Sequence, residues 1–320
     1  MKAVVIKKTG SFEVLEYTNT TKPKVVTGQV LVKNVFAGLN YIDTYHRSGL
    51  YPKVLPFILG VEGSGTIEEI GENTETDLQI GDRVAYFYGG SYAEYTAVPV
   101  AKIVKLPNSI SFIQGAASMI QGMTAFYLTN EIYKLQEGDW CLIHAGAGGV
   151  GSLAIQMAKH LGATVVTTVS TEEKAKLVKK LGADHVIMYK DVNFAEALLE
   201  LRPQGCELVL DGVGQATFQN SIKCTKTRGY LASFGNASGP VKPIPLLQLA
   251  RSIKVTRPSL FHYVQTKEEF TNKANKVFEL FEKNIITLKE SEPRNLSDVK
   301  QVHIDLESRK TTGKIVMRID

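Results

Sequence analysis

The residues with the clearest capacity for chemistry are the glycines of the segment HAGAGGVG. Gly146, Gly148 and Gly151 follow the spacing G-x-G-x-x-G, which is typical of a loop that binds a dinucleotide pyrophosphate. The segment also fits the frame of a nucleotide-hydrolase loop, which requires Lys and then Ser or Thr after its last glycine. Ser152 and Leu153 follow instead, so the lysine that would reach the terminal phosphates is missing. The segment therefore predicts dinucleotide binding.

The elements on either side of this loop have the types that such a site needs. DWCLIHA before it is a short apolar run that indicates a strand, and VGSLAIQMAKHLG after it has apolar residues at helical spacing. In a dinucleotide fold the N-terminus of that helix stabilises the anion. The alternative is that these small residues only permit tight packing. We expect cofactor contacts from Gly146, Ala147, Gly148, Gly149, Val150 and Gly151.

The end of the second strand of such a fold sets the preference between the two nicotinamide cofactors. NAD-binding proteins place Asp or Glu there, on the ribose 2′-hydroxyl. The segment ATVVTTVSTEEK has Ser170 at this point, with Lys174 near the first turn of the next helix. Ser170 could donate a hydrogen bond to a 2′-phosphate and Lys174 could supply charge, which predicts NADPH. Ser170 could also be an N-cap, with Glu173 completing a capping box, and the neighbouring glutamates count against a phosphate site.

Composition restricts the classes of protein to consider. The chain has 320 residues, 44% hydrophobic and 22% charged, which is typical of a soluble globular protein of about two domains. No apolar run approaches a membrane helix, and Ala3–Ile6 is too short for the core of a signal peptide. Cys141, Cys206 and Cys224 suggest neither a disulfide framework nor a zinc knuckle, which favours the reducing cytoplasm. The net charge of +5 is scattered, so nucleic-acid binding is not expected.

The order of the expected elements divides the chain into three parts. The first third is β-rich, with QVLVKNV, GSGTIEEI, DRVAYF and AEYTAV as short strands. From about Asp139, the strands CLIHA, TVVTTV, HVIMY, CELVLDG and GYLASFG alternate with helical patterns such as TEEKAKLVKKLG and NFAEALLELR. This alternation predicts a doubly wound parallel sheet, which SIKVTR would close. The tail has two helices, in KEEFTNKANKVFELFEKN and LSDVKQVHIDLES, and a strand GKIVMRI that could complete the first domain.

With these elements in place, the sequence resembles the medium-chain dehydrogenase/reductase superfamily, and within it the zeta-crystallin type of NADPH:quinone oxidoreductase. The pattern GDxxLxxxGAGGxGxxxxQxxK, which starts at Gly138, matches that family's signature, and the blocks NYIDTYHRSGLYP, SFGNASG, VTRPSL and ESRKTTGK add to it. The similarity runs from about Lys33 to the C-terminus. It implies an α/β fold in which a Rossmann NADPH-binding domain, 123–262, is inserted into a GroES-like β-rich catalytic domain, 1–122 and 263–320. The substrate cleft would lie between the two domains.

The resemblance also bears on zinc. Zinc-dependent relatives carry Cys where this chain has Asn40, and Gly-His-Glu where it has Gly60-Val61-Glu62. The four-cysteine structural lobe is also missing, so we expect no metal. His144, beside the glycine loop, is expected to be structural. Without a strong Lewis acid the acceptor must take hydride readily by itself, as a quinone does because its reduction gains aromaticity.

The segment GLNYIDTYHRSG offers polar groups that could orient such an acceptor. Asn40 could donate its amide N–H to a quinone oxygen and Tyr45 its phenol, although Tyr45 could equally be a half-buried aromatic residue. Asp43 and Arg47 could pair with each other at (i, i+4). The resemblance places Asn40, Asp43 and Tyr45 beside the nicotinamide, and implies that Arg257 contacts the substrate. It implies further cofactor contacts at Thr124, Tyr189, Phe234, Gly235, Asn236, Ser238 and Lys314.

Three functions and one assembly therefore remain as hypotheses. The first function is NADPH-dependent quinone reduction. The second is reduction of activated carbon–carbon double bonds, with hydride delivered to the β-carbon and a tyrosine as acid. The third is a non-catalytic, cofactor-bound role, against which the intact glycine loop argues. A homodimer through the edge strand SIKVTR is also expected because unpaired edges invite pairing, although Lys254 and Arg257 could blunt that edge.

Overall fold

The computed structural model of the protein describes residues 1–289 and 292–319. The chain forms two compact units, and it passes from one to the other more than once. Unit 1 comprises Met1–Met123, Val264–Lys283 and Leu288–Asp320, and unit 2 comprises Thr124–Tyr263 and Asn284–Thr287.

Unit 2 is built on a six-stranded sheet in which every neighbouring pair of strands is parallel. The spatial order is β11-β10-β9-β12-β13-β14. Numbered along the unit, this is 3-2-1-4-5-6, the order of the Rossmann dinucleotide fold. The predicted doubly wound sheet is therefore confirmed, including SIKVTR as its last strand. The strands are β9 (Trp140–Ile143), β10 (Thr164–Val169), β11 (His185–Met188), β12 (Cys206–Asp211), β13 (Thr225–Ser233) and β14 (Lys254–Thr256).

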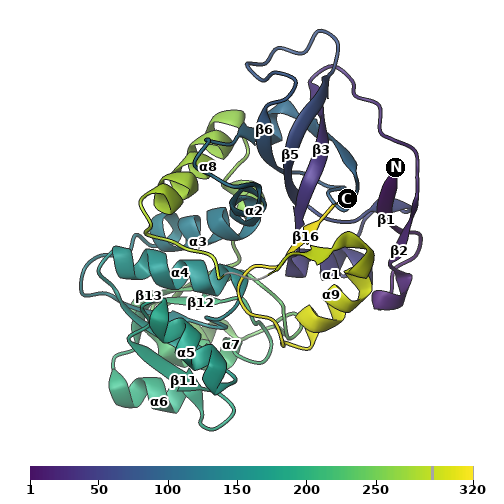
Figure 1. Cartoon of the computed structure of the whole chain (residues 1–320). Helices are drawn as coiled ribbons and strands as arrows, with labels where there is room; N and C mark the ends of the chain where they lie inside the picture. The colour runs from purple at the N-terminus through teal and green to yellow at the C-terminus, as the bar shows by residue number, and fades with distance from the viewer. Residues whose placement is uncertain (290–291, 320) are drawn as a thin grey trace. The chain divides into compact units, whose positions relative to one another are not determined.

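Helices cover this sheet because its strands are apolar toward both faces. Figure 1 shows α4 and α5 on the near side of the sheet and α7 behind it. Phe194 and Leu198 of α6 and Phe218 and Ile222 of α7 share one buried cluster with residues of the central strands. The helices are α3 (Met123–Tyr127), α4 (Gly149–His160), α5 (Glu172–Lys180), α6 (Phe194–Leu201) and α7 (Phe218–Cys224).

Unit 1 is β-rich, and its largest sheet is seven-stranded and centred on β3. This strand pairs antiparallel with β5, β7 and the C-terminal strand β16. The tail of the chain therefore completes a sheet that begins near its start. A second sheet has the order β2-β1-β4. The strands are β1 (Lys2–Ile6), β2 (Glu16–Asn19), β3 (Gln29–Gly38), β4 (Phe57–Ile58), β5 (Glu62–Ile70), β6 (Arg83–Phe87), β7 (Tyr95–Pro99), β8 (Ile103–Lys105), β15 (Arg294–Asn295) and β16 (Val316–Arg318).

The helices of unit 1 frame one end of the large sheet. α2 lies against β3, β5 and β6, and it continues directly into one turn of π-helix, Ser118–Gly122. A single π-helical turn inside a helical segment often marks a functional position, because the extra residue re-aims its side chains. None of the helices in the described ranges is long and apolar enough to cross a membrane. The α-helices are α1 (Tyr41–Ser48), α2 (Phe112–Ala117), α8 (Lys267–Glu282) and α9 (Val299–Glu307).

Candidate active site

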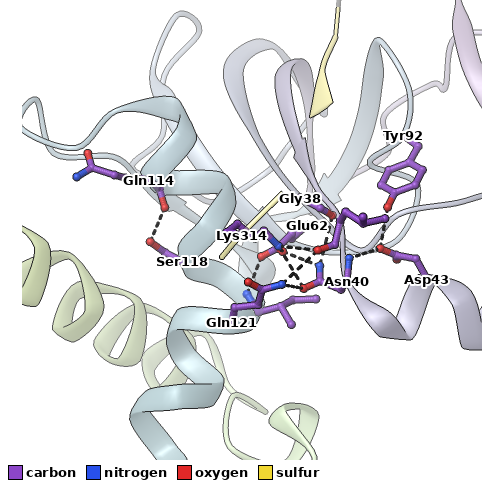
Figure 2. Close-up of polar contacts among 11 residues, drawn as sticks. Gly38, Asn40, Asp43, Glu62, Tyr92, Gln114, Ser118, Gln121 and Lys314 are labelled. Carbon is purple, nitrogen blue, oxygen red and sulfur yellow. Dashed lines mark hydrogen bonds and ion pairs between the residues drawn. The ribbon is translucent and has the colours of Figure 1, made fainter. Parts of the chain in front are cut away.

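A cluster of buried polar side chains in unit 1 joins the ends of several elements. Asn40 is the N-cap of α1, just after β3 ends, while Glu62 begins β5 and Lys314 lies shortly before β16. Figure 2 shows these three side chains converging with Gln121 from the π-helical turn. The antiparallel pairing of β3 with β5 and β16 places these positions at one end of the sheet.

The centre of this cluster is an ion pair between Lys314 Nζ and Glu62 Oε1, whose side chains are 2% and 0% exposed. Lys314 Nζ also donates to Leu39 O at 3.1 Å and to Asn40 Oδ1 at 3.2 Å. Its three ammonium hydrogens are thus committed to protein acceptors. The resemblance implies a cofactor contact for Lys314; in the structure its ammonium group lies inside the cluster, paired with Glu62.

Gly38 makes room for this ion pair. A Cβ built on Gly38 would lie 2.7 Å from Lys314 Nζ and 2.6 Å from Ala116 O, both shorter than real Cβ contacts. The second oxygen of Glu62 accepts from the backbone N–H of Ile120 at 2.7 Å. The ion pair therefore also fixes the π-helical turn against β5.

The side-chain amide of Asn40 is fully used within the cluster. Nδ2 donates to Glu62 Oε1 at 2.6 Å and to Gly38 O at 3.3 Å, while Oδ1 accepts from Gln121 Nε2 at 3.0 Å. Asn40 is only 4% exposed. The expectation that its N–H donates to a quinone oxygen would require one of these hydrogen bonds to be released.

Asp43 holds the start of α1. Its Oδ2 accepts from Asn40 N at 2.8 Å and from the phenol of Tyr92 at 2.8 Å. Burial raises the pKa of Asp43 to about 7, although both of these donors lower it. Asp43 is 0% exposed, and its hydrogen bond from the Asn40 backbone N–H positions Asn40.

The predicted (i, i+4) pair between Asp43 and Arg47 is wrong. Arg47 Nη2 lies 2.8 Å from Glu307 Oε1, and its Nη1 lies 3.1 Å from His303 Nδ1. Both partners belong to α9, more than 250 residues away in sequence. The pair does not form because Asp43 caps its own helix while the Arg47 side chain reaches α9.

Tyr45 lies on the buried side of α1 and is 9% exposed. Its ring packs edge-on against Tyr51, with centroids 5.1 Å apart, and lies 6.3 Å from the ring of Tyr41. This aromatic group holds the Tyr45 ring in place on the helix that Asn40 begins.

Two members of the unit 1 cluster were missed by sequence reasoning. Glu62 was considered only as part of a lost zinc-ligand motif, and Gln121 was not considered. A signal for Glu62 was available, because a carboxylate that opens an apolar strand needs a buried cation. Gln121 had no comparable signal, since only the π-helical turn aims it at Asn40.

In unit 2 the glycine loop is packed so closely that two of its glycines have no room for a side chain. A Cβ on Gly146 would lie 2.9 Å from Ile155 Cδ1, and one on Gly151 would lie 2.8 Å from Gly146 Cα. Helix α4 begins after Gly148, with no acidic residue in its first turn. Its first N–H groups lack intrahelical partners and are available to an anion. These residues therefore fit the pyrophosphate of a dinucleotide.

His144 lies next to this loop, where β9 and β12 end side by side. The strand order reverses between these two strands, and ligands of such sheets bind at that point. His144 Nδ1 lies 3.0 Å from Thr168 Oγ1, and Nε2 lies 3.0 Å from Ser221 Oγ. Burial lowers the pKa of His144, so the ring is neutral. The structural role of His144 stays a prediction, which these two contacts support.

Asp211 continues this network from the end of β12. It is 0% exposed and accepts from Ser221 Oγ at 2.8 Å, from Thr217 Oγ1 at 2.8 Å and from Val213 N at 2.9 Å. The carboxylate thereby fixes the loop that follows β12. Sequence reasoning did not single out Asp211.

After the end of β10, the residue that caps the next helix is not the one that was considered from the sequence. The N-cap of α5 is Thr171, whose side chain accepts from Lys174 N at 3.3 Å, so Ser170 is not the cap and forms no capping box with Glu173. Helix α5 starts one residue later than that interpretation assumed. Ser170 and Lys174 are both half-buried, and Tyr189, at the end of β11, is 36% exposed. No carboxylate occupies position 170.

The loop after β13 is tied to the loop after β12. Ser238 Oγ donates to Val213 O at 2.8 Å and accepts from Ala216 N at 2.9 Å. A Cβ on Gly235 would lie 2.9 Å from Gly212 Cα. Phe234 N donates to Asp211 O at 2.9 Å. The loop therefore lies at the carboxyl edge of the sheet, as expected from its place in the sequence.

The remaining predicted residues of unit 2 lie near the start of α3 and the end of β14. Arg257 Nη1 donates to Ser233 O at 2.9 Å, and with its amide correctly oriented Asn236 accepts from Arg257 Nη2 at 3.2 Å. Thr124 is 7% exposed and belongs to α3. Within residues 1–289 and 292–319, no group of three or more His, Cys, Asp or Glu side chains is arranged to hold a metal ion.

Comparison with known proteins places the chain among dehydrogenases and reductases. Residues 26–108 match the alcohol dehydrogenase GroES-like domain, and residues 149–279 match the zinc-binding dehydrogenase family. A quinone oxidoreductase of Pseudomonas aeruginosa is 42% identical over 96% of each chain. A 2-haloacrylate reductase of Burkholderia is 36% identical over 99% of this chain and 98% of its own. The crystal structure of Escherichia coli quinone oxidoreductase complexed with NADPH superposes with a TM-score of 0.96, at 37% identity and 100% coverage of both chains.

Proposed function

This chain belongs to the quinone oxidoreductase family of the medium-chain dehydrogenase/reductase superfamily, and we propose that it reduces quinones with NADPH. The observation that carries the proposal is the glycine cradle at the N-terminus of α4, which fits a dinucleotide pyrophosphate. The relatives named quinone oxidoreductases support the acceptor, and the NADPH complex of one of them supports the cofactor.

We assign each of these residues a role that its place in its own unit supports. NADPH, when bound, supplies the hydride. The loop Gly146–Gly151 would hold its pyrophosphate, while Ser170 and Lys174 would contact the 2′-phosphate and Tyr189 would lie near the adenosine. The loop Phe234–Ser238 would complete this site. We assign the NADPH-binding domain to 123–262 and the catalytic domain to 1–122 and 263–320.

The polar cluster of unit 1 would position the nicotinamide and the acceptor. Asn40 is held from three sides, by Glu62, Gln121 and Lys314, so the start of α1 is rigid. Tyr45 follows on the same helix, with its ring fixed by its aromatic neighbours. We assign Tyr45 the hydrogen bond that orients the acceptor. Pre-organised positioning of this kind lowers the barrier by removing the entropy cost of alignment.

A second candidate function is the reduction of activated carbon–carbon double bonds. It is favoured by the 2-haloacrylate reductase, which matches this chain over nearly its full length. In that reaction hydride goes to the β-carbon, and the resulting enolate needs a proton more urgently than a hydroquinone anion does. Tyr45 would then be a general acid rather than an orienting group.

One experiment tests the proposed function. The purified protein would be incubated with NADPH and either a panel of quinones or a panel of enones, with NADPH oxidation followed by absorbance. We expect turnover with quinones and slower turnover with enones. Preference for the enones would instead support the second function, and oxidation with neither class would contradict both.

We also propose that the protein is a cytoplasmic homodimer paired through β14. This strand is the edge of the unit 2 sheet, and unpaired edges invite association. Val255 on β14 is 37% exposed, while Leu246 and Leu247 shortly before it are each 82% exposed. We expect light scattering to give twice the 35.2 kDa chain mass. Val255→Asp should shift it to the monomer mass, whereas Val192→Asp, an exposed control in unit 2, should not. A monomer of the unaltered protein at micromolar concentration would contradict the proposal.

A further inference from the structure

Ala145, which precedes the first glycine of the loop in unit 2, has a backbone conformation that alanine rarely adopts. Its φ is 52°, in the left-handed region, where the Cβ of an L-residue crowds the following carbonyl oxygen. Glycine adopts this region without strain, yet this position of the loop holds alanine. Such a conformation persists only where the surrounding structure holds it. The contacts of Ala145 must therefore supply the constraint.

The carbonyl group of Ala145 joins the loop to helix α4. Ala145 O accepts from Gly148 N at 2.9 Å, which closes the turn immediately before the helix. A Cβ built on Gly151 would lie 2.5 Å from the same oxygen, so the first turn of α4 packs directly against it. The first N–H groups of α4 are the ones that are available to an anion. The direction of the Ala145 carbonyl group therefore affects how these N–H groups are presented.

The N–H group of Ala145 is held from the neighbouring strand β10. It donates to Thr168 Oγ1 at 3.3 Å, and the same hydroxyl oxygen lies 3.0 Å from His144 Nδ1. The backbone N–H of Gly146 donates to Thr168 O, also at 3.3 Å. Thr168 is 3% exposed and His144 is 2% exposed, so these contacts are made away from water, where hydrogen bonds are stronger. One residue of β10 thus holds both residues at the start of the loop.

The hydrogens of this network can be assigned from its far end. Ser221 Oγ lies 2.8 Å from Asp211 Oδ2 and 3.0 Å from His144 Nε2. If Ser221 donated to His144, its oxygen would face the Asp211 carboxylate with no hydrogen between them. His144 therefore carries its proton on Nε2 and donates to Ser221. Its Nδ1 is then a lone pair that accepts from the Thr168 hydroxyl, and the oxygen of that hydroxyl accepts from Ala145 N–H.

We propose that Thr168 and His144 are positioning residues, which hold Ala145 in its left-handed conformation and thereby position the glycine loop for a dinucleotide pyrophosphate. The inference rests on the proposed function and deepens it. His144 fixes the direction of the Thr168 hydroxyl, and that hydroxyl fixes the N–H group of Ala145. All of these residues belong to unit 2. A loop that is held in advance does not have to be ordered when the cofactor binds, and this raises affinity.

The affinity for NADPH, measured by titration calorimetry, tests the proposal. Thr168→Val keeps the shape of the side chain and removes its hydroxyl, so it should weaken binding about tenfold, which corresponds to about 1.4 kcal/mol. Thr168→Ser keeps the hydroxyl and should bind NADPH as the unaltered protein does. The double variant Ala145→Gly/Thr168→Val should recover most of the loss, because glycine adopts the left-handed region without strain. Thr129→Val, which removes another buried hydroxyl of unit 2, is the control and should leave the affinity unchanged.

A purely structural role of Thr168 predicts a different set of results. Thr168→Val would then melt at a lower temperature but bind NADPH normally while folded, or Ala145→Gly would recover none of the lost affinity. Either result would overturn the proposal.

Amide hydrogen exchange of the protein without NADPH gives a second measurement, which requires neither a folded Thr168→Val variant nor cofactor binding. The N–H of Ala145 should exchange slowly in the unaltered protein, although this residue lies outside the helices and strands. Exchange at the rate of an unprotected amide would show that Thr168 does not hold it and would also overturn the proposal. Failure of the unaltered protein to bind NADPH would contradict the proposed function instead, and the exchange of Ala145 would still decide how the loop is held.

Discussion

Lys314 and Glu62 lie 252 residues apart in sequence and form a fully buried ion pair in unit 1. The pair connects Glu62, the first residue of β5, to Lys314, which lies shortly before β16. It also holds Asn40 and the π-helical turn through hydrogen bonds. Two segments from opposite ends of the chain thus share one charge-neutral centre.

Lys314→Met is expected to destabilise unit 1 severely. It leaves Glu62 as an unpaired buried carboxylate, and breaking a buried pair in this way costs about 3–5 kcal/mol. The double variant Glu62→Gln/Lys314→Met removes both charges and should recover much of that loss. In thermal unfolding, the melting temperature should be highest for the unaltered protein, lower for the double variant and lowest for Lys314→Met. The exposed pair Lys276–Glu279 is the control, since Lys276→Met should cost less than about 1 kcal/mol. A single variant no less stable than the double would contradict the neutral-centre interpretation.

Asp43→Asn is expected to change how stability depends on pH. Burial raises the folded-state pKa of Asp43 to about 7, above its usual value of 3.8. The fold therefore binds this proton more tightly than the unfolded chain does, and stability falls as pH rises from about 4 to about 7. At about 1.4 kcal/mol per pKa unit, the change is bounded at about 4 kcal/mol. Asn at this position cannot ionise, so the variant should gain melting temperature relative to the unaltered protein between pH 5 and pH 8.

Buried histidines, among them His46, His144 and His303, impose the opposite trend, so the effect of Asp43 is measured as the difference in stability between Asp43→Asn and the unaltered protein at each pH. Burial lowers the pKa of His46 to about 4 and that of His303 to about 3. Each of these histidines contributes stability at pH values above its ordinary pKa of 6.5, and this contribution is lost as the pH falls below 6.5. The histidine contributions are the same in Asp43→Asn and in the unaltered protein, so they cancel in the difference. For the exposed control Asp191→Asn, the difference in melting temperature from the unaltered protein should not change with pH.

Lys174→Ala is expected to weaken NADPH binding by about 1–3 kcal/mol, the scale of a hydrogen bond to a charged group. NADH lacks the 2′-phosphate, so its affinity should change little. Titration calorimetry with both cofactors measures the selectivity, and Lys176→Ala on the exposed side of the same helix is the control. Equal affinity of the unaltered protein for NADPH and NADH would reject the assignment of Ser170 and Lys174.

Tyr45→Phe is expected to slow quinone reduction by only about tenfold, mostly through KM, because an orienting hydrogen bond is worth about 1.4 kcal/mol. On an enone the same change should reduce kcat by about 10²–10⁴-fold, because an obligatory acid would be lost. Steady-state rates on both acceptor classes separate the two roles. Tyr88→Phe, at an exposed tyrosine, is the control. A loss of about 10³ in kcat on quinones, with NADPH affinity unchanged, would make Tyr45 a true acid.

Those parts of this protein that depend on local pattern could be predicted from the residues alone. The glycine spacing, the apolar strand before it and the helical period after it specify the phosphate cradle, because backbone conformation and helix N-termini are local properties. The alternation of strands and helices predicts the parallel sheet for the same reason. The interpretation of Asn40 and Val61 as positions of lost zinc ligands came from the family resemblance.

The pairing of the polar side chains could not be predicted in this way, because it depends on which segments meet in the fold. Asp43 and Arg47 have ideal spacing for a helical ion pair, yet Asp43 accepts from Tyr92 and from the backbone of Asn40, while Arg47 pairs with Glu307 on α9. Lys314 had the residue type of a cofactor ligand, and only its burial against Glu62 shows that its hydrogens are already used. Hydrogen-bond capacity is filled by contacts between distant segments, and the spacing of residues along a chain does not contain those contacts.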